Sequence, residues 1–481
     1  MLILLIALPL LTGLAAALPF PSRRGRLTFL LTMQIIETAL VVWTLVSGRS
    51  YATNIWHLTE SLTIAMKLDG VAAVFSALTA VAWLLALIYS VEYMSHSQNE
   101  ARFYVFLFLS EGMLLGTALS ADFVSMYVFY ELTSLCSMPL VLHELTRESV
   151  TGAVKYLYYS IGGAFFVLFG IAVLYANTDT LNFAVGGTLS GEHTPLVLLA
   201  IFFVIIGFGT KAGLFPMHNW LPSAHPVAPA PASAVLSGII TKAGVLAIIR
   251  VTFYLFGADF LRGSWAQTTL LCLALTTVFA GSMLAYKEKV FKKRLAYSTV
   301  SQVSYVLFGL FLLNSVGFTG ALLQVVFHAL VKNLLFLAAG AVIYKTGKTD
   351  VRELSGIGKQ MPIVIWCFAF GALSLIGIPP TAGFVSKWYL AQGGISEYGA
   401  LGIAGAAILL VSALLTAGYL LPIVTRGFFP GRDFEYANLE KKEPSRYMTV
   451  PLVILAVLAV LLGVFPGGLT QFIGGISAVL F

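Results

Sequence analysis

The sequence is a succession of long apolar stretches separated by short polar connections. A run of about 20 mainly apolar residues is long enough to cross a bilayer as a helix. The pattern therefore predicts an all-α polytopic membrane protein with about 14 transmembrane helices. We expect these spans at about residues 1–20, 27–46, 70–91, 103–120, 122–143, 152–176, 195–217, 227–254, 267–286, 297–314, 318–344, 361–390, 399–425 and 449–472.

Composition and cysteine spacing support a membrane protein with no metal and no cofactor of its own. Of the 481 residues, 59% are hydrophobic and 10% are charged, whereas a soluble domain carries about 25% charged residues. The three cysteines (Cys136, Cys272 and Cys367) lie far apart and form no metal or iron–sulfur pattern. The sequence has no Walker loop and no dinucleotide fingerprint. We therefore expect the energy for any transport to come from a partner.

The basic residues predict the orientation of the spans. Twenty of the 28 Lys and Arg residues fall in the odd-numbered connections and three in the even-numbered ones. Cytoplasmic connections are enriched in Lys and Arg, so we expect the odd-numbered connections in the cytoplasm and both termini outside the cell inner membrane. The N-terminal apolar run precedes its arginines, which favours a retained span over a signal peptide. Arg250, near the end of its span, is interpreted as an interfacial anchor.

Four lysines lie inside predicted spans, where a charge is costly. The cost of a charged side chain at the bilayer centre is about 2.5–3.5 kcal/mol on insertion scales. Ionisable residues in such places usually line a proton or ion path, so the chain is a candidate ion translocator. The four are joined in their spans by one Glu and one His, and the predicted proton-translocation residues are Glu131, Lys211, Lys242, His328, Lys332 and Lys387.

Each station of this path has a structural alternative. Burial favours the neutral amine of Lys211, and a carboxylate at Glu131 would favour the charged form, so their separation could drive proton uptake and release; a static ion pair is the alternative. Lys242 is the next station, unless it snorkels to an interface. His328 and Lys332 are four residues apart and share one helix face. Lys387 is the expected outward donor; beside Trp388 and Tyr389 it could instead be an interfacial lysine.

Two histidines and two further acids complete the candidates. His218 and His225 flank the short seventh connection, which has no Lys or Arg. They form a possible site of proton uptake, because two histidines without a third ligand make a poor metal site. Glu37 and Glu111 lie in spans 2 and 4. They are either conduction partners or hydrogen-bonded structural acids.

An internal duplication is visible in the sequence. The motif that begins at Lys155 recurs 177 residues later at Lys332, and Lys211 and Lys387 are 176 residues apart. Five spans separate the copies, so they would be inverted relative to each other, as in many transporters. Spans 7 and 12 each contain Gly and Pro residues near a lysine, which predicts broken helices. We expect three helices in 1–100, the two five-helix repeats in 101–255 and 256–427, and a connection with the last helix in 428–481.

Four motifs resemble the antiporter-like family of proton-conducting membrane subunits. They are KAGLFPMHNWLPSAHPVAPAPASAVLSGIITKAG from Lys211, KRLAYSTVSQVSY from Lys293, HALVKNLLF from His328 and GIPPTAGFVSKW from Gly377. The family includes the large antiporter-type subunits of respiratory complex I, Mrp Na+/H+ antiporter subunits, and subunits of membrane-bound hydrogenases and formate hydrogenlyases. The resemblance covers about residues 100–425. It implies fourteen helices with two inverted repeats, and places the family's conduction positions on the six residues named above.

The resemblance implies a subunit that is not catalytic alone. Its partners would be homologous antiporter-like subunits and a redox or hydrogenase module, with H+ and possibly Na+ as cargo and no nucleic acid. An Mrp-type Na+/H+ antiporter subunit or a stand-alone cation/proton antiporter is the alternative. A stand-alone sodium antiporter would need a carboxylate-rich site, and only Glu37, Glu111 and Glu131 lie in predicted spans. A scaffold that conducts nothing is disfavoured by the full set of titratable residues.

Overall fold

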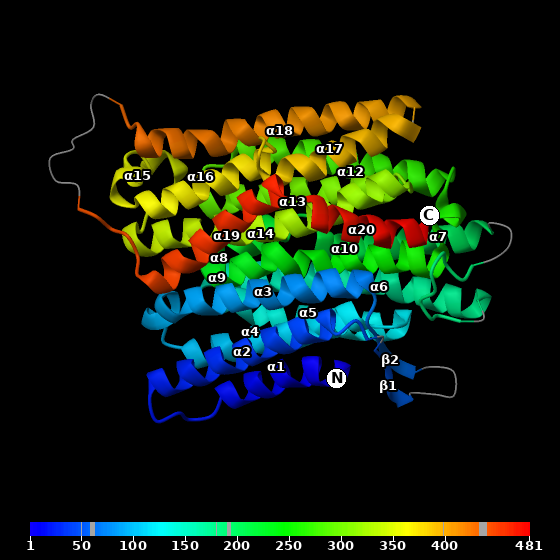
Figure 1. Cartoon of the computed structure of the whole chain (residues 1–481), viewed down its shortest axis with the longest axis horizontal. Coiled ribbons are helices and arrows are strands. Elements are labelled where there is room, and N and C mark those ends of the chain that lie inside the picture. Colours follow the sequence, from blue (N-terminus) through cyan, green and yellow to red (C-terminus); the bar gives the residue numbers. More distant parts are fainter. Residues whose placement is uncertain (50, 58–62, 179, 190–193, 398, 432–439) are drawn as a thin grey trace.

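The computed structural model describes residues 1–49, 51–57, 63–178, 180–189, 194–397, 399–431 and 440–481. Long helices lie side by side along one common direction and form a bundle, with both termini at the same end (Figure 1). The elements are α1 (Leu2–Ala16), α2 (Arg23–Val46), β1 (Ala52–His57), β2 (Thr63–Lys67), α3 (Gly70–Tyr93), η1 (Met94–His96), α4 (Glu100–Leu119), α5 (Phe123–Val141), α6 (Arg147–Asn177), α7 (Pro195–Ala212), α8 (Leu221–Val227), α9 (Ala230–Val235), η2 (Leu236–Ile240), α10 (Thr241–Ile249), η3 (Arg250–Phe256), α11 (Ala258–Leu261), α12 (Trp265–Lys287), α13 (Phe291–Phe311), α14 (Ser315–Thr346), η4 (Val351–Glu353), α15 (Ile357–Gln360), α16 (Pro362–Ile376), α17 (Ala382–Glu397), α18 (Gly399–Phe428), α19 (Arg446–Val464) and α20 (Gly467–Leu480).

The helices confirm an all-α polytopic membrane protein. Eleven helices of the described residues are long and apolar enough to cross a membrane, and three shorter apolar helices accompany them. The number of fourteen spans stays a prediction, because the broken helices are too short to count by length. The small departure from an all-α fold is an antiparallel hairpin of β1 and β2 after α2. It lies at the end of the bundle that holds both termini (Figure 1).

The core is built around two central segments. Residues 230–256 and α14 form these segments, and almost every position in their most apolar windows is buried inside the protein. In Figure 1, α1 to α3 lie at one edge of the bundle and α16 to α18 at the other, with α8 to α10 between them. A polar side chain on either central segment is therefore shielded from lipid by protein, which is where ionisable groups in membrane proteins are tolerated.

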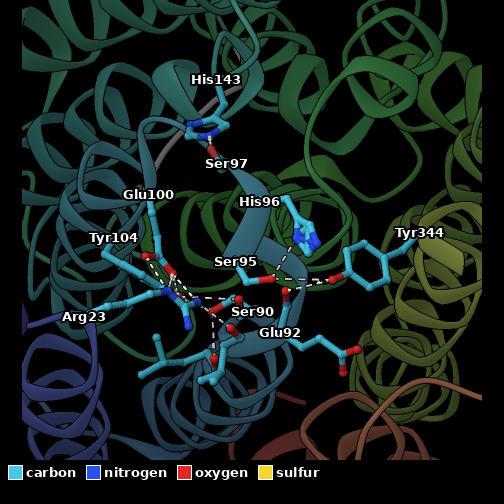
Figure 2. A network of polar contacts seen from close by, with 12 residues as sticks. Arg23, Ser90, Glu92, Ser95, His96, Ser97, Glu100, Tyr104, His143 and Tyr344 are labelled. Atoms are coloured by element: carbon cyan, nitrogen blue, oxygen red, sulfur yellow. Dashed lines mark hydrogen bonds and ion pairs between the residues drawn. The ribbon is translucent and has the colours of Figure 1, made fainter.

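The helix ends opposite the termini are joined by ion pairs. This end, called the basic end, carries the connections 17–22, 97–99, 142–146, 288–290 and 347–350. Arg23 donates to the Glu100 carboxylate at 2.6 Å and to the Val91 carbonyl at 2.6 Å. Figure 2 shows this pair beside Glu92, whose carboxylate accepts from Lys345 on α14 at 3.1 Å. These contacts connect α2, α3 and α4 to the second half of the chain.

Both predicted helix breaks are present. The first half of span 7 ends at Gly213, whose φ of 80° is in the left-handed region, and α8 follows at Leu221. The first half of span 12 ends in the same way at Gly377, with a φ of 92°. Glycine adopts this backbone conformation at no steric cost, which explains its place at both breaks. Span 7 was predicted to reach residue 217, and that boundary is wrong by five residues.

Three further expectations need correction or fall outside the structure. The last span is two helices, α19 and α20, because Pro466 follows a helix end at Phe465. Arg250 is not an interfacial anchor: it is buried and donates to Asp69 at 2.5 and 2.9 Å. Arg432, one of the basic residues of the odd-numbered connections, lies outside the described residues.

Candidate functional site: a chain of buried amines

Lys211 ends the first half of the broken span 7 and is buried against α5. Its Nζ donates to the Tyr130 carbonyl at 3.0 Å and to Ser134 Oγ at 2.7 Å. The same nitrogen lies 3.8 Å from the centre of the Tyr130 ring, a cation–π distance. The amine is therefore fully engaged with neutral groups of one neighbouring helix.

Glu131 is half-buried on α5, next to Tyr130. Its Oε1 has no hydrogen-bond partner, and no ion pair to Lys211 is found among the described residues. The charges of the two groups still lie within electrostatic range of each other. The static ion pair considered for this site is therefore absent, and Glu131 is an acid near Lys211 without a fixed contact.

Lys242 is held by an irregular stretch of its own helix. Its Nζ donates to the Ser237 carbonyl at 2.5 Å, inside the π-helical segment η2, and contacts Thr241 Oγ1 at 3.4 Å. Only 1% of the residue is exposed, so the snorkelling alternative is wrong. Short π-helical segments are often found at functional sites, because the wider turn leaves carbonyl groups available.

A line of hydroxyl groups leads from Lys242 to Lys332. Ser237 Oγ lies 2.7 Å from Thr299 Oγ1 on α13. The residue before Thr299, Ser298, accepts from Lys332 Nζ, which also donates to the Leu295 carbonyl at 3.0 Å. Each hydroxyl can both donate and accept. The two central segments are thus joined by a continuous set of groups able to exchange protons.

His328 is buried one turn before Lys332. Neither ring nitrogen has a hydrogen-bond partner, although 1% of the residue is exposed. The ring lies within electrostatic range of Lys242, Lys332 and Lys387. A buried polar group without a partner costs stability and needs an explanation. A proton carrier between these lysines would supply one.

Lys387 lies on α17, beyond the second break, and reaches back to the end of α16. Its Nζ donates to the Leu375 carbonyl at 2.5 Å and to the Ile376 carbonyl at 2.8 Å. A cavity of ≈ 10 Å³ between His328 and Leu375 is lined also by Gln324, Ser374 and Gly383. A space on the order of 10–15 Å³ is enough for one water, so the imidazole and the amine are separated by about one molecule. The interfacial alternative for Lys387 is not supported by this inward contact.

The two histidines of the seventh connection lie in different surroundings. His218 is half-buried in the turn between α7 and α8, and its ring is 5.8 Å from that of Phe215. His225 does not flank an open loop as expected: it lies on α8, fully buried, with both ring nitrogens unpartnered. Its ring is 4.9 Å from that of Phe336 on α14. The break in span 7 folds α8 inward, which explains the difference.

Glu37 and Glu111 face each other across α2 and α4, apart from the lysines. Glu111 accepts from Gln34 at 2.7 Å, whereas both oxygens of Glu37 lack a partner. Both acids are buried. The structure does not connect them to the lysines through any hydrogen bond of the described residues.

Several polar residues of the site were not predicted. Gln324 donates to Gln302 at 3.1 Å and accepts from Ser386 at 2.6 Å, which joins α13, α14 and α17 beside Lys387. A signal was present, because Gln324 is four residues before His328, as His328 is before Lys332. Ser298 and Tyr130 had no such spacing, and their role depends on contacts between helices.

Family comparisons agree with this geometry. The family described as "NADH:quinone oxidoreductase/Mrp antiporter, TM" matches residues 120–416, and "NADH-Ubiquinone oxidoreductase (complex I), chain 5 N-terminus" matches residues 56–104. The chain is 34% identical to the NADH-quinone oxidoreductase subunit N of Desulforudis audaxviator, over 96% of this chain and 95% of the relative. It is 32% identical to the Na(+)/H(+) antiporter subunit A1 of Staphylococcus haemolyticus over 86% of this chain, but spans 54% of that protein.

Solved structures show the same fold. A chain of the Mrp complex from Dietzia sp. matches with a TM-score of 0.87 and 26% identity, over all of this chain and 97% of that one. A chain of respiratory complex I from Thermus thermophilus matches with a TM-score of 0.83 and 22% identity, over 100% of both chains. The second likeness concerns the fold alone.

Proposed function

Because the chain belongs to the NADH:quinone oxidoreductase/Mrp antiporter family of membrane subunits, we propose that it moves protons across the membrane along its buried lysines. The observation that carries the proposal is the set of hydroxyl, amide and imidazole groups that joins Lys242, Lys332 and Lys387. A chain that only needed to fold would gain from apolar residues at these positions. Glu131 modulates the charge on Lys211, and Lys387 releases protons at the end opposite the basic end.

The path is built on two inverted repeats in this proposal, 101–255 and 256–427. The opposite positions of the lysines relative to the breaks support the assignment. Lys211 precedes its break, whereas Lys387 follows its break. Alternating access around such breaks is a common design of transporters with inverted repeats.

The partner is a redox module in this proposal, and the chain is one subunit of a larger inner-membrane complex. The relative that matches over the full length of both chains is the NADH-quinone oxidoreductase subunit N. The antiporter relatives are nearly twice as long as the matched region. The basic end faces the cytoplasm, with both termini outside, because basic connections remain on that side. An Mrp-type Na+/H+ antiporter subunit is the second candidate, favoured by the likeness to the Mrp complex.

Acidification of inverted membrane vesicles that carry the whole complex tests the function. We expect Lys211→Ala to abolish the proton gradient while the complex assembles normally. Lys359→Ala, which removes an exposed lysine of α15, is the matched control and should pump at the native rate. Pumping by Lys211→Ala at the native rate would refute the path. Purification in mild detergent then separates the candidates, because a redox module or a set of Mrp subunits should accompany the chain.

A further inference from the structure

A polar cavity opens at the basic end, apart from the proposed path through Lys211. Its volume is ≈ 230 Å³, and its lining comes from the ends of α3, α8, α13 and α14 and from the connection after α5. Glu144 is exposed at its rim, whereas Lys292 is buried, with 6% of the residue exposed. Lys292 was counted with the loop lysines in the sequence, and its burial corrects that interpretation.

Lys292 connects this cavity to the second half of the broken span 7. Its Nζ donates to the Pro226 carbonyl at 3.1 Å and to the Ala228 carbonyl. These carbonyls belong to the last turn of α8 and its cap, which have no partner inside the helix. No ion pair to Lys292 is present in the part of the chain that the structure describes. The ammonium is held by dipoles alone.

His225 lies directly behind this contact. It is the residue before Pro226, and both of its ring nitrogens are buried without a partner. It is within electrostatic range of Lys292, Lys332 and Lys242. Phe336 lies between His225 and Lys332: its ring centre is 4.9 Å from the imidazole centre and 5.9 Å from Lys332 Nζ. Cavity, amine, imidazole and central lysine thus follow one another from the surface inward.

We propose that Lys292 takes up protons from this cavity and passes them through His225 to Lys332, as a second inlet that bypasses Lys211. The inference rests on the proposed proton path and adds a route into its second half. A proton from solvent binds the neutral amine of Lys292, moves to a free ring nitrogen of His225, and leaves for Lys332 when the Phe336 ring turns aside. The surrounding cations repel one another, so that the route holds one transferable proton at a time.

The decisive variant is Lys292→Arg. The guanidinium can donate to the same two carbonyls and keeps the charge, but it does not release a proton in a protein. We expect normal assembly with pumping in inverted vesicles reduced at least tenfold. Lys289→Arg, three residues away and exposed, should pump normally. Native pumping by Lys292→Arg would show that Lys292 only caps α8 and would overturn the proposal.

A labelling experiment keeps the proposal testable if that variant fails to fold. In a chain with its three cysteines replaced by serine, Lys292→Cys should react with a small positively charged thiol reagent added from the basic end, whereas Lys242→Cys should not. Absence of reaction at position 292 would overturn the inlet. Failure of the proposed function is distinguished by Lys211→Ala: if both that variant and Lys292→Arg pump normally, the whole path is wrong, not only the inlet.

Discussion

Replacement of Lys332 by methionine should separate conduction from stability. Lys332 is fully buried on α14, and its amine donates to the Leu295 carbonyl and Ser298 Oγ. Without the amine, a proton must pass this point as an unsupported charge. That charge costs about 2.5–3.5 kcal/mol, which at about 1.4 kcal/mol per factor of ten corresponds to a pumping rate reduced roughly 100-fold.

The same change should leave the fold intact. The Leu295 carbonyl still accepts from Thr299 Oγ1 at 3.0 Å, so only Ser298 loses a partner. The lost hydrogen bonds contribute about 0.5–1.5 kcal/mol each. Burial of an ion costs several kcal/mol, and replacement of buried ionic groups by apolar ones is often neutral or stabilising by about 1–4 kcal/mol. We therefore expect the thermal unfolding midpoint of Lys332→Met to equal or exceed that of the native complex.

The assay combines two measurements on one preparation. Proton uptake into inverted vesicles is followed with a pH-sensitive dye, and thermal unfolding of the detergent-purified complex is followed by size-exclusion chromatography after heating. Lys359→Met provides an exposed control. Native pumping by Lys332→Met would refute its role in conduction. A much lower unfolding temperature would refute the energetic argument, because the amine would then be a structural tie.

Three further predictions concern structure around the path. Arg250→Met leaves the Asp69 carboxylate without its ion pair and should lower stability by about 3 kcal/mol; Asp69→Asn in the same chain should recover part of the loss in thermal unfolding. Gly463→Ala would place a Cβ 2.2 Å from the backbone of the turn between α16 and α17, so we expect a loss of about 1–3 kcal/mol and slower pumping, whereas unchanged unfolding would show that α19 can move away. Burial lowers the pKa of His143 to about 4, with Arg102 adding to the effect. Because the unfolded value is about 6.5, the neutral imidazole favours folding, and stability should fall as the pH drops from about 6.5 towards 4; His143→Gln should flatten that decline in unfolding measured against pH.

The parts of the fold that follow from local composition were predictable. Apolar runs fix where helices cross the membrane, and glycine with proline fixed both breaks, because these residues act through their own backbone. The buried lysines were found for a similar reason, since the cost of the charge depends mainly on the span around it. Even the missed break before α20 had a local signal in Pro466 and its flanking glycines.

Contacts between distant segments were not predictable in the same way. Asp69 and Arg250 are 181 residues apart, and nothing near either residue indicates the other. Lys292 belongs to a run of basic residues that is typical of a cytoplasmic loop. It is buried because α8 ends against it, which depends on how the broken span 7 folds. The pairing expected for Glu131 and Lys211 was wrong in its geometry, since a helix turn brings Tyr130 and Ser134 to the amine instead.

The choice of partners for these amines explains why broken helices accompany them. Lys387 and Lys292 bind carbonyls at the ends of α16 and α8, and Lys242 binds a carbonyl of the π-helical η2. The C-terminal end of a helix carries partial negative charge and stabilises a cation by about 0.3–1 kcal/mol, or more when buried. A carboxylate partner would hold the proton firmly and would leave a buried anion when the amine released it. Carbonyl dipoles favour the ammonium yet remain neutral after it deprotonates, so an irregular helix beside each amine permits both states that conduction requires.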